Sequence, residues 1–121
     1  MYEIPSDPSQ AVADVFRRTC PARFLLGRIS GKWSMLVIDA LQEGPVRNGE
    51  LMRRIDGISQ KMLTQTLREL EEMQLVDRKD MQTVPPHVEY SLTEKGRSLE
   101  PILLALKDWG EQHALPQLDP S

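Results

Sequence analysis

The chain has 121 residues, 40% hydrophobic and 27% charged, which suits one domain with a single moderate core. Its single cysteine excludes a disulfide framework within the chain, and its two histidines show no zinc-site spacing. No apolar run approaches the roughly 20 residues that a membrane helix needs. We therefore expect a cytoplasmic protein that uses no cofactor or metal and has no membrane partner.

The N-terminal part is expected to be a loose arm followed by helices. Residues 1–8 carry two prolines and no hydrophobic periodicity, and a short helix is predicted to start near Ser9. Because proline favours the first turn of a helix, the pair Cys20-Pro21 predicts a new helix with Cys20 at its cap. The next predicted helix spans 31–44, and its apolar positions are Trp33, Leu36, Val37, Ala40 and Leu41.

Two further helices joined by a tight turn are predicted to follow. Asn48 is a good cap for a brief helix that would bury Leu51 and Ile55. An Asp-Gly turn and Ser59 then open a helix over about 59–73. Its apolar stripe should face the core, while its opposite face groups two cations with two neutral hydrogen-bonding side chains. The inward residues are Leu63, Leu67 and Leu70, and the outward residues are Lys61, Thr64, Gln65 and Arg68.

The outward face allows two interpretations. Charged outer faces are common on ordinary amphipathic helices, and the net charge of −3 argues mildly against nucleic acid. The local balance favours DNA, however, because the segment 45–68 contains five cations and two acids. Cations and hydrogen-bonding side chains hold phosphates and read base edges. The five cations are Arg47, Arg53, Arg54, Lys61 and Arg68.

A β-hairpin is predicted after this helix. Segments 75–79 and 87–92 are typical of strands, and the intervening residues include two consecutive prolines that would stiffen a projecting loop. A helix-turn-helix followed by such a loop predicts a wing over about 80–87. The hairpin residues that we expect to lie near DNA are Arg78, Lys79, Pro85, Pro86 and His87.

The C-terminal part is predicted to be one long helix with an apolar stripe. Thr93 should cap the run 94–113, Pro101 should kink or divide it, and 114–121 should form a flexible tail. The stripe is wider than a domain of this size can easily cover, which predicts a two-fold dimer. The dimerisation candidates are Leu99, Leu103, Leu106 and Trp109.

The order and spacing of many short motifs resemble the HxlR-type family of bacterial winged-helix transcription regulators, relatives of the MarR group. The resemblance covers about residues 20–110 and implies a homodimer formed by terminal helices. It also implies a helix over 59–73 in the major groove, a wing at Pro85-Pro86, and double-stranded DNA with a near-palindromic operator as the partner. The residues that carry it include Cys20-Pro21, Gly31-Lys32-Trp33, Glu50-Leu51, Gly57-Ile58-Ser59, Pro85-Pro86, Val88-Glu89-Tyr90-Ser91-Leu92-Thr93, Gly96 and Trp109.

Three positions depart from the family pattern. Asn48 stands where an aromatic is usual, Gln74 replaces the usual glycine after the DNA-reading helix, and Met81 stands where tyrosine is often found. Cys20 has two interpretations. It is either an inert buried thiol or a sensor of oxidants or electrophiles, a role that the resemblance implies because some members of the family use a cysteine at this place in that way.

The sequence therefore predicts a mainly α fold with a small antiparallel β-hairpin of two or three strands, arranged as a winged helix-turn-helix over 9–113. The predicted function is that of a sequence-specific DNA-binding transcriptional regulator. The alternative is a winged-helix protein-interaction module that does not bind DNA. An enzyme is not expected, because the chain has no phosphate-binding glycine loop and no nucleophile motif.

Overall fold

The computed structural model describes residues 16–115. The predicted arm, the helix start near Ser9 and tail residues 116–121 lie outside this range. The first predicted helix covers residues 11–19, but residues 16–19 form turns instead of the end of a helix. The chain forms two compact units, Met1–Gly31 and Lys32–Ser121.

The described part of the first unit contains one helix, α1 (Pro21–Ile29). Pro21 occupies its first turn, and the Sγ of Cys20 accepts a hydrogen bond from the Arg23 N–H at 3.4 Å. The predicted helix start is therefore confirmed. Within the helix, the guanidinium of Arg28 lies over the Phe24 ring, 5.2 Å from its centroid.

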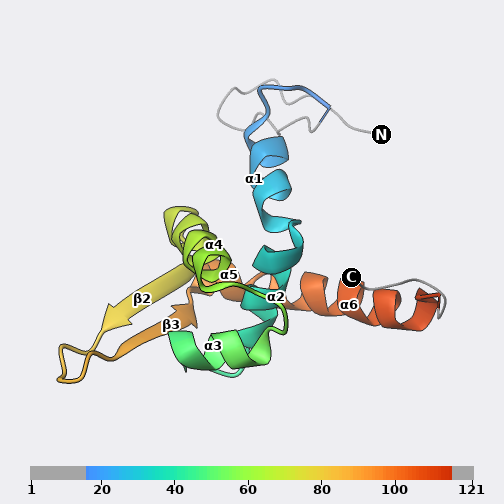
Figure 1. The fold of residues 1–121 in the computed structure, drawn as a ribbon. Coiled ribbons are helices and arrows are strands. Elements are labelled where there is room, and N and C mark those ends of the chain that lie inside the picture. The colour runs from blue at the N-terminus through green and yellow to red at the C-terminus, as the bar shows by residue number, and fades with distance from the viewer. Residues whose placement is uncertain (1–15, 116–121) are drawn as a thin grey trace. The chain divides into compact units, whose positions relative to one another are not determined.

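The second unit combines helices with a three-stranded sheet, whose strands β2 and β3 are labelled in Figure 1. Its elements are α2 (Lys32–Ala40), β1 (Val46–Arg47), α3 (Asn48–Arg54), α4 (Gln60–Glu72), β2 (Val76–Asp80), β3 (Val88–Leu92), α5 (Glu94–Arg97) and α6 (Glu100–His113).

The core of this unit lies where α2, α3 and α4 meet the first residues of β2. Its apolar side chains come from every one of these elements, so each element depends on the others for burial. Large side chains with at most 1% exposure are Ile38, Leu41, Leu51, Leu63, Leu67, Leu70 and Leu75.

The inward face of α2 differs from the predicted one. Ser34, Val37 and Ile38 are buried, whereas Leu36 is 42% exposed. Because residues three and four apart share one face of a helix, Ser34, Val37, Ile38 and Leu41 define the stripe. Leu36 therefore lies beside this stripe, and its predicted place in the core is wrong.

The predicted cap of α3 is displaced by one residue. Arg47, not Asn48, occupies the N-cap position, and it makes no side-chain capping hydrogen bond. Arg47 is extended because β1 continues through it and pairs with Glu89. Asn48 is therefore the first helical residue, while Leu51 is buried as predicted.

The predicted hairpin is confirmed, and of the two or three strands expected the sheet has three. β3 lies at the centre of the antiparallel order β1-β3-β2. Val46 pairs with Tyr90 on one side of it, and Val76 pairs with Leu92 on the other. The long C-terminal helix is divided, as predicted at Pro101, into α5 and α6, and Pro101 lies in the first turn of α6.

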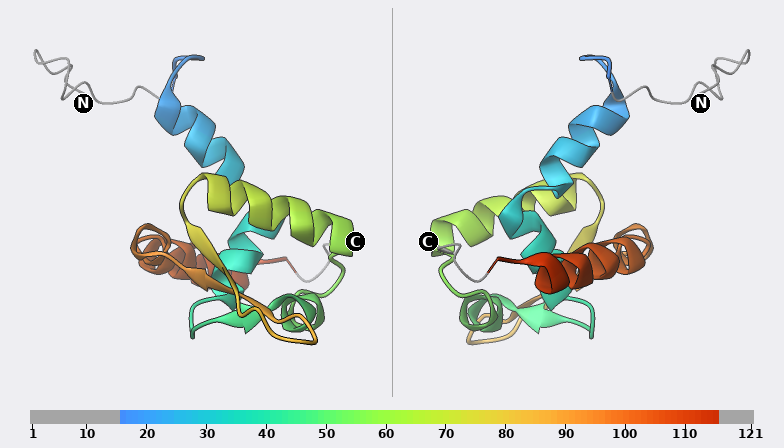
Figure 2. Two further views of the ribbon diagram at one scale, coloured as in Figure 1. Left: turned by 90° about the vertical axis from the view of Figure 1, so that its left-hand side faces the viewer. Right: turned by 90° about the vertical axis from the view of Figure 1, so that its right-hand side faces the viewer.

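These elements form a winged helix-turn-helix. α3 and α4 are joined by a short turn, and the β2–β3 hairpin extends past α4 as the wing (Figures 1 and 2). Among the residues described, no helix has the length and apolar character to cross a membrane.

Candidate nucleic-acid interface

The start of α4 is organised by local chemistry. Gly57 has φ +88°, a conformation that glycine adopts without steric cost. Ser59 follows with extended backbone, and its Oγ accepts a hydrogen bond from the Met62 N–H at 3.0 Å. The predicted cap is confirmed, and it sets the point at which α4 begins.

The two faces of α4 separate as predicted. Leu63, Leu67 and Leu70 are buried as predicted, and Thr66, which was not predicted, is buried beside them. Thr66 satisfies its buried hydroxyl by donating to the Met62 carbonyl at 2.7 Å. The burial of Thr66 could have been predicted from its position three residues after Leu63, on the apolar face of the helix.

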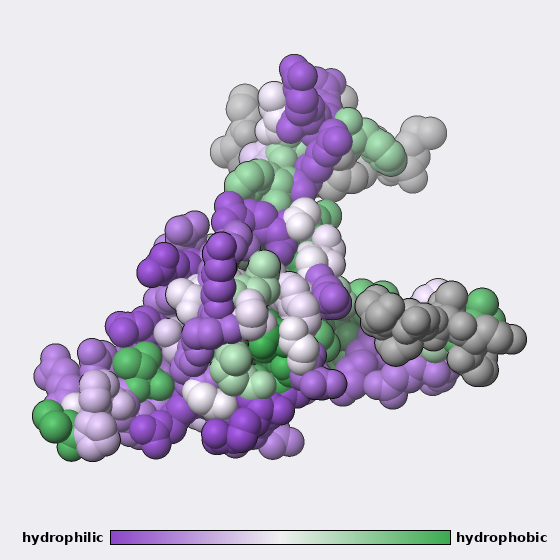
Figure 3. Space-filling view, in the orientation of Figure 1, coloured by the Kyte–Doolittle hydropathy of each residue, from purple (hydrophilic) through white to green (hydrophobic). Residues whose placement is uncertain are grey.

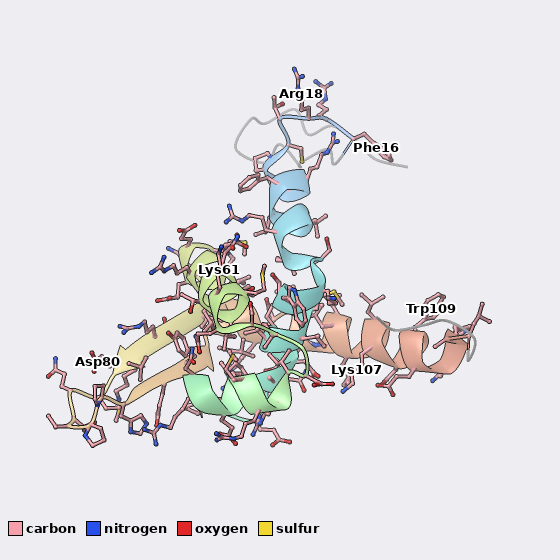
Figure 4. All side chains as sticks on the ribbon, viewed as in Figure 1. Phe16, Arg18, Lys61, Asp80, Lys107 and Trp109 are labelled. Carbon is pink, nitrogen blue, oxygen red and sulfur yellow. The ribbon has the colours of Figure 1, made fainter. Side chains whose placement is uncertain are left out.

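The outer face of α4 carries the predicted polar set. Lys61, Gln65 and Arg68 are exposed and Thr64 is half-buried, with Lys61 visible on the outside of the helix in Figure 4. No described carboxylate forms an ion pair with Lys61 or Arg68. Both cations are therefore available to phosphates or base edges.

The two neutral side chains of this face already have hydrogen-bond partners on α4. Gln60 Nε2 donates to Thr64 Oγ1 at 3.0 Å, and Gln65 Nε2 donates to Glu69 Oε1 at 3.4 Å. Both hydrogen bonds are exposed to solvent, so water or another polar partner can replace either bond at small cost.

The C-terminal end of α4 is stabilised by hydrogen bonds from the segment that follows β3. Thr93 Oγ1 donates to the Gln74 carbonyl at 2.7 Å, and its N–H donates to the Leu75 carbonyl at 3.0 Å. Lys95 Nζ donates to the Met73 carbonyl at 3.0 Å. These three bonds satisfy carbonyls just after the helix and fix its end.

The sheet places the predicted DNA-binding cations Arg47, Arg78 and Lys79 on two different faces. Arg47 and Lys79 both pair with Glu89, so they lie on the same face of the sheet. Arg78 pairs with Tyr90 and lies on the opposite face. His87 Nε2 lies 2.8 Å from Glu89 Oε2, so this histidine already has a partner within the protein.

The tip of the wing is apolar and internally braced. Pro85 and Pro86 are exposed, and Val84 is 99% exposed. Gln82 N–H donates to Asp80 Oδ1 at 2.8 Å, and Thr83 Oγ1 donates to the Pro85 carbonyl at 2.8 Å. Figure 3 shows hydrophobic surface at the end of this loop.

The predicted dimerisation residues on α6 are not equivalent. Trp109 and Leu106 are 60% and 49% exposed, but Leu103 is 8% exposed and therefore belongs to the monomer core. Leu99 is half-buried at the N-cap. Ile102, outside the named candidate set, is 63% exposed and lies one helical turn from Leu106.

Cys20 is buried and lies at the first turn of α1. Besides the hydrogen bond from Arg23 to its sulfur, its own N–H donates to the Arg17 carbonyl at 3.1 Å. The sulfur therefore contacts a backbone N–H group in the first turn of α1.

The comparisons with known proteins agree with this arrangement. The model of the HxlR-like helix-turn-helix family matches residues 28–118. The chain belongs to this HxlR-like family. It is a transcriptional regulator with a helix-turn-helix domain, related to the MarR-family winged-helix regulators.

Three HxlR-like relatives illustrate the similarity. YkvN, an HTH-type transcriptional regulator of Bacillus subtilis, is 57% identical over 86 residues, which are 71% of this chain and 73% of YkvN. The structure of the transcriptional regulator ytfH from Salmonella typhimurium has a TM-score of 0.78 at 39% identity, covering 84% of this chain and 90% of ytfH. The structure of the redox regulator HypR in its oxidized form has a TM-score of 0.74 at 47% identity, covering 79% of this chain and 99% of the HypR chain.

Proposed function

We propose that this regulator binds double-stranded DNA in a sequence-specific manner, with α4 in the major groove and the 80–87 loop as the wing. The observation that carries the proposal is the outer face of α4. Lys61 and Arg68 are exposed there without an ion-pair partner among the described residues, and Gln65 lies between them. The capping bonds at both ends hold α4 rigidly enough to present this face to base edges.

The proposed contacts fall into two classes. Lys61, Arg68, Arg47 and Lys79 supply positive charge for phosphates, and Gln65 and Thr64 supply hydrogen bonds for base edges. Ser59, Arg78, Pro85, Pro86 and His87 complete the proposed interface. Of these residues, His87 contributes least, because its contact with Glu89 already uses a ring nitrogen.

A gel-shift titration with the promoter next to the protein's own gene tests this function. DNA binding should weaken steeply between about 50 and 200 mM salt, because neutralised phosphates release counterions. Absence of a shift at the lower salt concentration would favour the alternative, a protein-interaction module that does not bind DNA.

We also propose a homodimer, which would bind a near-palindromic operator. Ile102, Leu106 and Trp109 expose an apolar stripe on α6 that the described chain does not cover. In a two-fold dimer through this helix, two copies of α4 would lie about 34 Å apart, one turn of DNA. Sedimentation at micromolar concentration should give a dimer.

A redox or electrophile response through Cys20 is the third part of the proposal. Its support is the sulfur's position at the start of α1 and the likeness to HypR, which is a redox regulator. Because the chain has one cysteine, oxidation leads to a sulfenic acid, a mixed disulfide or a bond to the partner subunit. Operator binding under peroxide should change for wild type and not for Cys20→Ser. Equal responses would mean that Cys20 is structural.

A further inference from the structure

A cavity of about 500 Å³ opens on α2 beside the turn between α3 and α4; we name it the α2 cavity. Its size lies within the roughly 300–1,000 Å³ range of small-molecule sites. Its lining residues are Leu36, Asp39, Ala40, Arg54, Ile55 and Asp56.

A second hollow of about 200 Å³ adjoins the α2 cavity, since Leu36 and Asp39 line both. Its remaining wall comes from Met35 on α2 and from Leu103 and Lys107 on α6. Figure 4 shows Lys107 and Trp109 on different sides of α6. The hollow therefore does not share the exposed face that we propose for dimerisation.

The charges around the α2 cavity are unbalanced. Arg54 donates to the Ala40 carbonyl at 2.8 Å and pairs with Glu50 at 3.4 Å, and Lys107 pairs with Asp39 at 3.4 Å. Both cations therefore have acceptors. Asp56 is exposed, and none of the described cations forms an ion pair with it. The cavity consequently has a carboxylate in excess.

We propose that the α2 cavity binds a small amphipathic organic cation. Its apolar body would lie against Leu36 and Ile55, and its ammonium group would lie beside Asp39 and Asp56. Leu36 is large, apolar and 42% exposed, which leaves hydrophobic surface at the cavity wall for such a body to cover. An anion of the same size would meet the excess carboxylate instead.

Because of the position of the α2 cavity, a bound ligand could affect the orientation of α4. Asp56 lies in the turn immediately before the Ser59 cap, and α2 packs against both α4 and α6. A cation that holds the turn against α2 would bias the orientation of α4. This regulatory consequence rests on the proposed DNA binding, whereas ligand binding itself does not.

Calorimetric titration of the full chain with benzyltrimethylammonium tests the binding step. The cation should bind, and benzenesulfonate and benzyl alcohol should bind less or not at all. Asp39→Asn and Asp56→Asn should each weaken binding about two- to fivefold, the range for exposed ion pairs. Leu36→Lys should remove it, because this change places a cation and extra bulk in the site.

Asp108→Asn is the matched control, since this exposed aspartate lies on α6 outside both hollows. It should leave the affinity unchanged, and thermal melts should show that all four variants fold. No binding of the cation, equal binding of the sulfonate, or an equal loss in Asp108→Asn would overturn the proposal.

A gel shift with saturating cation tests the regulatory step. Operator affinity should change roughly fivefold or more for wild type and remain unchanged for Leu36→Lys. Cation binding with no change in operator affinity would overturn the effector role. If the protein bound no operator at all, the proposed DNA binding would fail, and the calorimetry would still decide whether the cavity binds cations.

Discussion

Gly96 packs directly against the carbonyl group of Leu75. A Cβ atom at position 96 would overlap the Leu75 oxygen and would lie only 3.1 Å from its carbonyl carbon. The same carbonyl accepts the Thr93 N–H, so α5 is locked onto the segment that follows α4. Only glycine permits this close approach, because it has no Cβ.

Gly96→Ala should therefore lower the free energy of unfolding by about 1–3 kcal/mol, since the overlapping atom is backbone and cannot rotate away. Urea unfolding measures the change. Gly110→Ala on α6 is the control, because its added Cβ meets no atom within 4 Å. This control should be neutral or stabilising by up to about 1 kcal/mol. A neutral Gly96→Ala would show that α5 is not packed as described.

Gln74→Gly should stabilise the protein. Gln74 has φ +61°, in the left-handed region that costs a side-chain-bearing residue about 1 kcal/mol or more. Glycine removes that cost and adds unfolded-state entropy, so the expected net gain is about 0.5–1 kcal/mol by urea unfolding. Ala105→Gly, at an exposed position in the middle of α6, should instead destabilise by roughly 0.5–1 kcal/mol. A loss in both variants would contradict the left-handed backbone at Gln74.

These two positions show what local chemistry in the sequence can and cannot reveal. The family resemblance placed glycine where Gln74 stands, and the structure has the backbone that favours glycine there. Ser59 and Pro101 were also predictable, because capping and proline geometry depend on neighbouring residues alone. Burial of Leu63, Leu67 and Leu70 followed from helical periodicity for the same reason.

The missed features depend on contacts between distant segments. Arg47 replaces Asn48 as the cap of α3 because β1 pairs with β3, some forty residues later in the chain. Leu36 was expected in the core but lies beside the core face of α2 and is exposed. Leu103 was expected at the dimer interface but packs into the core. Periodicity identifies an apolar stripe but does not show which edge of it the neighbouring helix covers.

Leu106→Glu should convert the proposed dimer into a monomer. The change places a charge in the exposed stripe of Ile102, Leu106 and Trp109, where an uncompensated carboxylate opposes burial. Leu104→Glu is the control, because Leu104 is 44% exposed and lies on the other side of α6. Sedimentation equilibrium should give a monomer for Leu106→Glu and a dimer for Leu104→Glu. The reverse pattern would place the interface on the other side of α6.

Gln65→Ala should alter the choice among operator sequences. A side-chain amide that contacts a base edge contributes about 1–3 kcal/mol of discrimination, and its removal should reduce the preference at one base pair by that amount. Competition gel shifts with single-base operator variants measure the effect. Gln112→Ala on α6 should leave every preference unchanged. If Gln65→Ala also changed none, Gln65 would not read a base.

The most direct measurement for the proposed DNA contact is the salt dependence of operator binding in Arg68→Ala. Removing one phosphate contact should weaken binding to all sequences alike and reduce the slope of log K against log salt by about one unit. Arg97→Ala removes the same charge from α5, where Arg97 lies 3.5 Å from Glu100, and should leave the slope unchanged. An unchanged slope and affinity in Arg68→Ala, or equal losses in both variants, would contradict the placement of the outer face of α4 on DNA.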